Sequence, residues 1–254
     1  MTTQPLSPSF SHERFIQQAR WGEALRRYLF SRFGLGDGAR LLEVGCGTGA
    51  VIPSFRGYAN YETHGLDIHL PFVRFARSHD PQTGYTCGDG LHLPYVNGAM
   101  DAALCHFFLL WVPNAEAALA EMIRVTRPGG VVMALAEPDY GGRVDFPPPL
   151  DEIGRLQTES LRRQGAEPNM GRRLAGMFHA AGLREIETGV LGAQWQGRPS
   201  LQERAAEWEV LESDLQDHLD PAGLERMRRV NESAWEDGSR VLFVPTFYAV
   251  GRKK

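Results

Sequence analysis

The sequence predicts an α/β fold in which helices cover both faces of a mostly parallel sheet. Strand and helix patterns alternate between residues 38 and 140. Residues 99–110 are almost wholly apolar, as expected of a strand that is covered on both faces. A glycine-rich turn at residues 45–49 directly follows a buried strand, which is typical of ligand-binding α/β sheets. We therefore expect right-handed crossovers between parallel strands.

Size and charge narrow the class of protein. The chain has 254 residues, 43% hydrophobic and 23% charged, which is enough for one large domain. A net charge of −4 argues against a nucleic-acid binder, which would show a basic face. No apolar run approaches the ~20 residues of a membrane span, and the first residues lack a signal-peptide core. We expect a cytoplasmic monomer or homodimer that binds a small molecule.

Cysteines and histidines give no sign of a metal or a disulfide. Cys46, Cys87 and Cys105 have no close pairing, and each ends a predicted buried strand. We interpret them as small core residues of a protein in a reducing compartment. The eight histidines show no spacing typical of metal ligands, so no metal is predicted.

The elements follow in a regular order. Residues 10–34 place apolar side chains at helical spacing and are expected to form one or two lid helices. Pro53 should confine or kink the helix that starts after the glycine turn. The core at residues 38–140 is predicted to contain five strands, at 39–45, 61–68, 84–89, 99–110 and 131–138. Helices should separate these strands.

The pattern changes after residue 140. Segments 141–181 and 197–238 are mainly helical and are predicted to form a cap. Segments 182–196 and 239–254 are predicted to be a terminal strand pair whose last strand is antiparallel. We find no internal repeat and expect one domain over residues 1–254.

The glycine turn leaves more than one ligand open. Gly45, Gly47 and Ala50 fit the G-x-G-x-x-G/A pattern of dinucleotide-binding turns. A tight turn that only needs glycine at positive φ would look the same. Gly49 adds a third glycine, and Glu43 lies inside the end of the strand. The turn alone therefore does not separate a nicotinamide dinucleotide from other adenosine ligands.

Two acidic residues favour an adenosine ligand. Asp67 ends the second strand, where a carboxylate accepts hydrogen bonds from both ribose hydroxyls. Asp89 ends the third strand and is placed to accept from an adenine amine, which a nicotinamide site does not require. Ile68 and Leu91 could sandwich the ring. A solvated turn or a helix N-cap is the alternative for both acids. We favour the ligand because open α/β sheets bind ligands at this edge.

Five segments together resemble the class I S-adenosylmethionine-dependent methyltransferases. They resemble in particular the small-molecule branch that includes the ubiquinone/menaquinone-type enzymes. The segments are "LLEVGCGTG", "GLDI", "GDGLHLP", "DAALCHFFLLWV" and "RVTRPGGVVMALAEP", in family order over roughly residues 38–140. The resemblance implies a Rossmann-like seven-stranded sheet in the order 3-2-1-4-5-7-6, with the last strand antiparallel. It also implies S-adenosylmethionine as cofactor and S-adenosylhomocysteine as product.

The resemblance assigns roles to matching positions. The glycine turn would pass under the methionyl group, Asp67 would bind the ribose, and Asp89 would accept from the adenine amine. Glu43 would order the turn and the ammonium group. The residues assigned to the cofactor are Glu43, Gly45, Cys46, Gly47, Gly49, Asp67, Ile68, Asp89, Gly90, Leu91, His106 and Phe107.

Methyl transfer needs alignment and exclusion of water, and also a base when the nucleophile is a hydroxyl or an acidic carbon. His106 is the candidate base, although a core histidine that only bonds the cofactor or the backbone is an equal alternative. Family members that methylate exocyclic amines carry [ND]-PP-[YFW] where this chain has "HFFL", which disfavours that reaction. The predicted acceptor pocket consists of Trp21, Glu137, Asp139, Tyr140 and Arg143.

The sequence thus predicts an enzyme that methylates an oxygen or carbon of a small hydrophobic or aromatic molecule. Two alternatives remain at this point. One is an NAD(P)-dependent oxidoreductase on a related fold. The other is a non-catalytic protein that binds S-adenosylmethionine.

Overall fold

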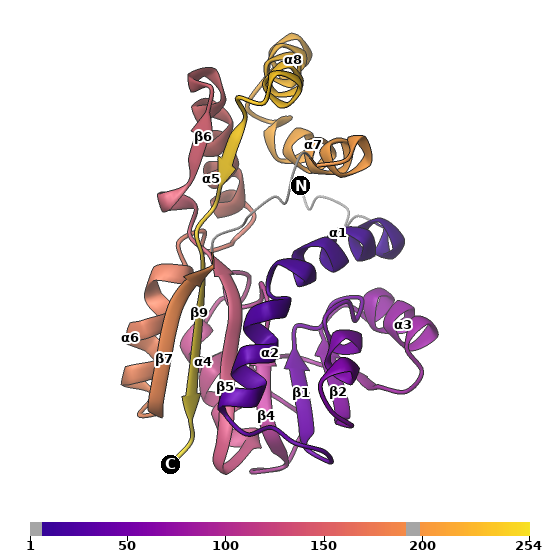
Figure 1. The fold of residues 1–254 in the computed structure, drawn as a ribbon, viewed down its shortest axis with the longest axis vertical. Coiled ribbons are helices and arrows are strands. Elements are labelled where there is room, and N and C mark those ends of the chain that lie inside the picture. Colours follow the sequence, from indigo (N-terminus) through magenta and orange to yellow (C-terminus); the bar gives the residue numbers. More distant parts are fainter. Residues whose placement is uncertain (1–6, 192–198) are drawn as a thin grey trace.

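A seven-stranded sheet forms the centre of the protein. The computed structural model describes residues 7–191 and 199–254. The strands are arranged in the order β3-β2-β1-β4-β5-β9-β7, and β9 runs antiparallel to both of its neighbours (Figure 1). The strands span Arg40–Val44 (β1), Glu62–Asp67 (β2), Gly84–Cys87 (β3), Met100–Cys105 (β4), Thr126–Pro138 (β5), Arg184–Leu191 (β7) and Thr246–Arg252 (β9). Because β9 is the seventh strand of this sheet along the chain, the predicted order and the antiparallel last strand are confirmed.

Helices cover both faces of the sheet. One core cluster joins the sheet to α4 and α6, and a second joins it to α2, α3 and the 3-10 helix η1. The α-helices are Pro8–Trp21 (α1), Glu23–Arg32 (α2), Leu70–His79 (α3), Ala115–Val125 (α4), Asp151–Arg163 (α5), Leu174–Ala180 (α6), Leu201–Leu215 (α7) and Pro221–Asp237 (α8). The 3-10 helices are Ile52–Gly57 (η1), Tyr140–Gly142 (η2), Pro148–Leu150 (η3) and Gly171–Arg173 (η4).

Strand β4 explains the first part of the long apolar run, but it ends at Cys105, so residues 106–110 are not part of the strand that was expected at 99–110. Ala103 and Cys105 belong to the cluster under α4 and α6, whereas Ala102 and Leu104 belong to the cluster on the other face. All four are fully buried. A central parallel strand has no solvent face, so alternation of polar and apolar residues is lost there.

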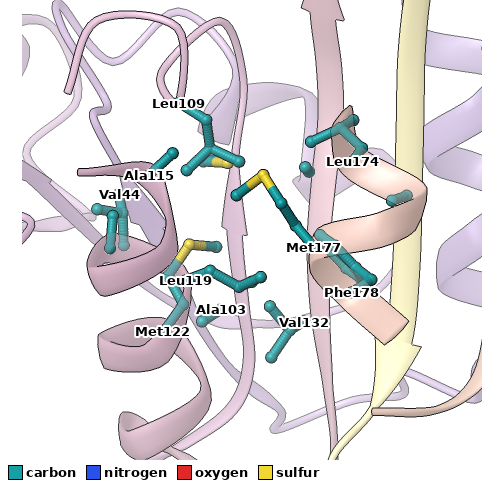
Figure 2. Close-up of a cluster of buried hydrophobic side chains, with 14 of the residues drawn as sticks. Val44, Ala103, Leu109, Ala115, Leu119, Met122, Val132, Leu174, Met177 and Phe178 are labelled. Carbon is teal, nitrogen blue, oxygen red and sulfur yellow. The ribbon is translucent and has the colours of Figure 1, made fainter. Parts of the chain in front are cut away.

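Side chains from two helices meet over the centre of the sheet. Figure 2 shows Leu119 and Met122 of α4 facing Phe178 of α6, with Ala103 and Val132 of the strands beneath them. The Phe178 side chain is 0% exposed. Burying such side chains supplies much of the stability of the domain.

A cap lies beyond the carboxyl ends of the strands. Leu150, Ile153 and Leu156 pack against Trp208 and Leu211 of α7, so the cap has its own small core. Figure 1 shows α5, α7 and α8 together at one end of the molecule, with α1 between α7 and the sheet. Helix α6, which lies inside the segment 141–181, packs instead on the sheet against β7 and β9.

The chain end differs from the single closing strand expected at 239–254. Val241–Phe243 forms β8, which pairs with Val144–Phe146 (β6) in a separate two-stranded sheet. Pro245 lies between β8 and β9, where its missing N–H interrupts strand pairing. In the other segment of the expected pair, 182–196, the structure has β7 up to Leu191, and residues 192–196 lie outside the described residues.

Two further expectations concern the helix after the glycine turn and the burial of the three cysteines. The helix after the glycine turn is only the short 3-10 helix η1, with Pro53 in its first turn. Cys46 and Cys105 are buried, but Cys87 is exposed and not a core residue. Cys87 ends β3, which is an edge strand and is covered less than the central strands. Within the described residues, no helix combines the length and apolar character needed to cross a bilayer.

We expect Phe178→Ala to lower the free energy of unfolding by about 3–5 kcal/mol, because it leaves a cavity in the core. Urea unfolding followed by circular dichroism measures this change. Val96→Ala is the matched control, since Val96 is 77% exposed and its truncation should cost less than about 0.5 kcal/mol. Equal costs for the two variants would contradict the packing described for α6.

Candidate active site

The glycine turn is fixed to the end of β2. Gly45, Gly47 and Gly49 have φ values of 74°, 52° and 75°, which side chains with a Cβ rarely adopt. The Gly47 N–H donates to Asp67 Oδ2 over 2.8 Å, and the Gly45 N–H donates to the Leu66 carbonyl, also over 2.8 Å. The turn therefore has one defined position beside Asp67.

Aromatic rings add a second reason for glycine in this region. A Cβ on Gly45 would lie 2.4 Å from the Phe108 ring, and one on Gly90 would lie 2.7 Å from the same ring. A Cβ on Gly49 would lie 2.3 Å from Tyr85 Oη. The sequence motif suggested only a ligand or a tight turn, whereas the structure shows that close protein packing also requires these glycines.

The two predicted acids lie at the same edge of the sheet. Asp67 Oδ1 accepts from the His69 N–H over 2.8 Å, and Asp89 Oδ1 accepts from the Leu91 N–H over 2.9 Å. The Leu91 hydrogen bond is the main reason why the pKa of Asp89 is lowered, so Asp89 is ionised at neutral pH. Each acid therefore stabilises its own turn, as the alternative interpretation required. That role does not exclude a ligand, because 45% of the Asp89 side chain is exposed.

Ile68 stands beside these acids with 63% of its surface exposed. A large apolar side chain at the end of β2 that is open to solvent suits a flat apolar ligand face such as an adenine ring. The structure thus brings Asp67, Ile68, Asp89 and Leu91 to one sheet edge, as the sequence predicted.

A buried polar cluster lies between the N-terminal helices and the sheet. Glu43 is 2% exposed, and its Oε2 has no hydrogen-bond partner among the described residues. Burial raises the pKa of Glu43 to about 8, and the nearby positive charge of Arg26 opposes this shift. The Arg26 guanidinium is also buried, and its Nη1 donates to the Ala19 carbonyl over 2.7 Å.

His106 belongs to the same cluster. A Cβ on Gly22 would lie 3.1 Å from Arg26 Nη1 and 3.9 Å from His106 Nε2, which places both beside the junction of α1 and α2. His106 Nε2 is buried and has no hydrogen-bond partner in residues 7–191 and 199–254. Burial, together with Arg26, lowers the pKa of His106 to about 3.

The low pKa of His106 favours its role as a hydrogen-bonding partner over its role as a base. A histidine with a pKa near 3 is neutral at physiological pH and is a weak base. A neutral ring with a free nitrogen still forms a hydrogen bond with a bound ligand. The geometry therefore supports ligand contact rather than proton abstraction by His106.

The orphaned atoms of this cluster fit a cofactor with polar groups. An unsatisfied buried polar group costs about 1–3 kcal/mol, so Glu43 Oε2 and His106 Nε2 favour a ligand that supplies partners. The amino-acid end of S-adenosylmethionine has both an ammonium and a carboxylate group. The residues present at the turn therefore fit the cofactor that the sequence implied.

Arg26 was missed in the sequence analysis, although a signal was available. It lies on α2 three, four and seven residues before the buried side chains of Leu29, Phe30 and Phe33. That spacing puts an arginine on the apolar face of a helix. A cation on the apolar face of a helix was the sign of a tertiary polar cluster.

A cavity of about 100 Å³ opens beyond the end of β4, and residues of α1 and of the cap line it. Trp21, Tyr140 and Arg143, which the sequence assigns to an acceptor pocket, line it, and so does Phe107. The other lining residues are Arg14, Gln17, Gln18, Pro138, Gln157, Ala206, Glu207, Val210, Leu211, Leu242, Val244 and Thr246.

Glu137 and Asp139, also expected in the pocket, do not line this cavity. Glu137 is 0% exposed, and its carboxylate accepts from the backbone N–H groups of Phe108, Leu109 and Leu110 over 2.9–3.1 Å. Burial raises the pKa of Glu137 to about 7, and these hydrogen bonds oppose the shift. Both Asp139 oxygens accept from Arg172. The two carboxylates hold the walls of the site in place.

A protein-family model described as a methyltransferase domain matches residues 42–134. Together with the sheet order and the site at its carboxyl edge, this match decides the family of the core. Residues 42–134 are a class I S-adenosylmethionine-dependent methyltransferase domain. The cavity lies at the border of this methyltransferase domain with α1 and the cap.

The curated relatives match slightly less than half of this chain. A demethylmenaquinone methyltransferase of Renibacterium salmoninarum is 33% identical over 127 residues, which cover 49% of this chain and 52% of the relative. A malonyl-[acyl-carrier protein] O-methyltransferase of Serratia marcescens is 36% identical over 114 residues, covering 43% of this chain and 44% of the relative. The chain thus spans about half the length of the curated relatives it matches.

Solved structures match the fold over most of the chain. The crystal structure of the [4+2]-cyclase SpnF covers 91% of this chain and 81% of its own chain, with a TM-score of 0.57 and 23% identity. This likeness concerns the fold, which includes the cap region outside the matched methyltransferase domain.

In the part of the chain that the structure describes, no three His, Cys, Asp or Glu side chains gather as a metal site.

We expect Glu43 to make stability depend on pH. Its pKa is raised in the folded protein, so its contribution to stability is complete below about pH 4.5 and is lost as the pH rises through about 8. Glu43→Gln should therefore flatten the decline in the free energy of unfolding over this range. Urea unfolding at several pH values measures the slope. Because the pKa of Glu137 is also raised, part of the decline in the free energy of unfolding should remain in the Glu43→Gln protein.

Glu209→Gln on the exposed side of α7 is the control and should keep the wild-type slope. A Glu43→Gln protein with an unchanged slope would show that Glu43 is ionised in the folded state.

Proposed function

We propose that this protein transfers a methyl group from S-adenosylmethionine to an oxygen or carbon of a small, largely hydrophobic or aromatic molecule. The observation that carries this proposal is the cavity beyond β4, which is lined mainly by apolar side chains and opens beside Phe107. Phe107 directly follows His106 of the buried cluster. The cavity thus begins one residue from the proposed cofactor contact His106, which places it to hold a small acceptor.

The proposed cofactor contacts follow from the site. Asp67 and Asp89 would bind the ribose and the adenine amine, and Ile68 would pack on the ring. Glu43 and His106 would hold the amino-acid end through their unpaired atoms. When bound, the cofactor supplies an electrophilic methyl group. The protein then contributes alignment and exclusion of water, which α1 and the cap provide above the cavity.

The relatives support a small or carrier-bound acceptor and not a particular one. One relative is named as a methyltransferase of a quinone, and the other as an O-methyltransferase of a malonyl group on a carrier protein. Neither name refers to a nucleic acid as the methyl acceptor. The fold alone does not assign the reaction, because a [4+2]-cyclase shares it. The proposal therefore rests on the methyltransferase domain match together with the cavity.

S-adenosylhomocysteine should bind the wild-type protein in a calorimetric titration. Asp67→Asn and Asp89→Ala should each weaken binding by about 10- to 100-fold, because each removes a charged hydrogen-bond acceptor. Asp217→Ala is the control, since Asp217 lies exposed outside the site and its loss should leave the affinity unchanged.

Three results would count against the proposal. Absence of heat with the wild-type protein would reject the cofactor. Saturable binding of NADH in its place would favour the oxidoreductase alternative. Tight binding of S-adenosylhomocysteine without methyl transfer to a broad panel of phenols, quinols and carboxylates would favour a non-catalytic protein.

A further inference from the structure

One face of α1 brings hydrogen-bond donors to the cavity. Arg14, Gln17, Gln18 and Trp21 follow one another at intervals of three, one and three residues, so all four share one face of the helix, and all four line the cavity. Gln17 Nε2 is buried and has no hydrogen-bond partner among the described residues. Arg14 likewise forms no hydrogen bond or ion pair with residues 7–191 or 199–254. Arg14 and Gln17 of this wall thus offer donors that no other side chain or backbone group of the described residues uses.

The opposite wall carries an acid. Glu207 of α7 lines the same cavity and has no hydrogen-bond or ion-pair partner within the described part of the chain. Burial raises the pKa of Glu207, and the negative charge of Asp145 acts in the same direction. Arg143, Arg240 and Arg14 oppose this shift. Glu207 is therefore a stronger proton acceptor than a solvated carboxylate.

The other charges near the cavity neutralise one another. Arg143 binds Asp145 through Nε and Nη2 and binds the side chain of Gln157 through Nη1. Arg240 Nη2 donates to Asp145 Oδ1 over 2.7 Å. Gln157 also donates to Asp214 over 2.8 Å. These side chains form the rigid floor of the cap, which leaves Arg14 and Glu207 as the charges available to a ligand.

The remaining lining is apolar, apart from the phenol of Tyr140 and the side chain of Thr246. Phe107, Val210, Leu211, Leu242 and Val244 surround the space between the two charged walls. A ligand that suits this lining has an apolar or aromatic body and one polar end. That end must satisfy unused donors on α1 and face a proton acceptor on α7.

We propose that the methyl acceptor is an acidic hydroxyl compound, a phenol or an enol, whose oxygen binds Arg14 and Gln17 while Glu207 takes its proton. This inference rests on the proposed methyltransferase function and names the acceptor class for the same cavity. A partly buried carboxylate such as Glu207 accepts a proton from a phenol, with a pKa of about 10, far more readily than from an aliphatic alcohol. An amine is disfavoured because, unlike a phenolate, it offers Arg14 no anionic acceptor.

The reaction that follows is balanced. The hydroxyl O–H bond breaks, and its proton passes to the Glu207 carboxylate. The oxygen then uses a lone pair to form a bond with the methyl carbon. The carbon–sulfur bond breaks, and its electron pair stays on sulfur, so the sulfonium becomes a neutral thioether. Arg14 stabilises the negative charge that develops on the oxygen, and Glu207 afterwards returns its proton to water.

Binding of 4-nitrophenol tests the anion site without turnover, because its phenolate form absorbs visible light and its neutral form does not. The wild-type protein should bind the phenolate and lower the titration midpoint of the bound probe. Arg14→Gln should weaken phenolate binding by about tenfold, whereas Arg14→Lys should retain most of it. Arg20→Gln is the matched control, since Arg20 lies on the same helix and is exposed.

The Glu207→Gln variant distinguishes the role of the α7 wall in proton transfer from the role of the α1 wall in binding. It removes a negative charge opposite the phenolate, so it should bind the probe at least as tightly as the wild-type protein while methyl transfer to phenols falls. Its pH–rate profile should also lose the limb that reports ionisation of Glu207.

Several results would overturn the inference. They are the absence of saturable probe binding, binding as the neutral phenol, equal affinity for 4-nitroanisole, and equal effects of Arg14→Gln and Arg20→Gln. Any of them, in a protein that still binds S-adenosylhomocysteine, would reject the acceptor class and leave the proposed methyltransferase function standing. If the wild-type protein does not bind S-adenosylhomocysteine at all, the proposed methyltransferase function itself is rejected.

Discussion

The hydrogen bond from the Gly47 N–H to Asp67 is the contact on which the site depends. It joins the turn after β1 to the end of β2, and three positive φ angles allow the turn to reach that position. The same Asp67 carboxylate is held by the His69 N–H on its other oxygen. Asp67 therefore ties the turn to the start of α3, which gives a ligand a preformed edge.

Helix α1 connects this edge with the acceptor cavity. Its His12 side chain bonds to the Thr48 hydroxyl of the glycine turn over 2.9 Å, and the Phe15 ring lies against Gly47. One turn further along, Gln17 and Trp21 line the cavity. A single helix thus covers the turn and forms one wall of the acceptor space.

Much of the core was predictable because its pattern is local. A buried strand followed by a glycine turn, and acids at the ends of the next two strands, mark the ligand edge in the sequence itself. The apolar β4 likewise reveals a central strand. The outcome for Glu137 was not predictable, because a polar residue at a strand end looks the same whether it faces a pocket or binds three backbone N–H groups.

The walls of the cavity were the least accessible to sequence reasoning. Trp21, Tyr140 and Arg143 were found from their positions near strand ends or on the lid, but Arg14 and Glu207 meet across the cavity from opposite ends of the chain. No local spacing connects them. The division at Pro245 was also not predicted from the sequence. One strand was expected at the chain end, but the strands on either side of Pro245 belong to two different sheets.

Hydrogen–deuterium exchange with and without S-adenosylhomocysteine locates the cofactor site along the chain. Binding at the glycine turn should slow exchange in three separate segments, at residues 43–50, 67–69 and 89–91, together with α1 above them. Protection confined to other parts of the chain, or no protection at saturating ligand, would contradict a cofactor site at the glycine turn.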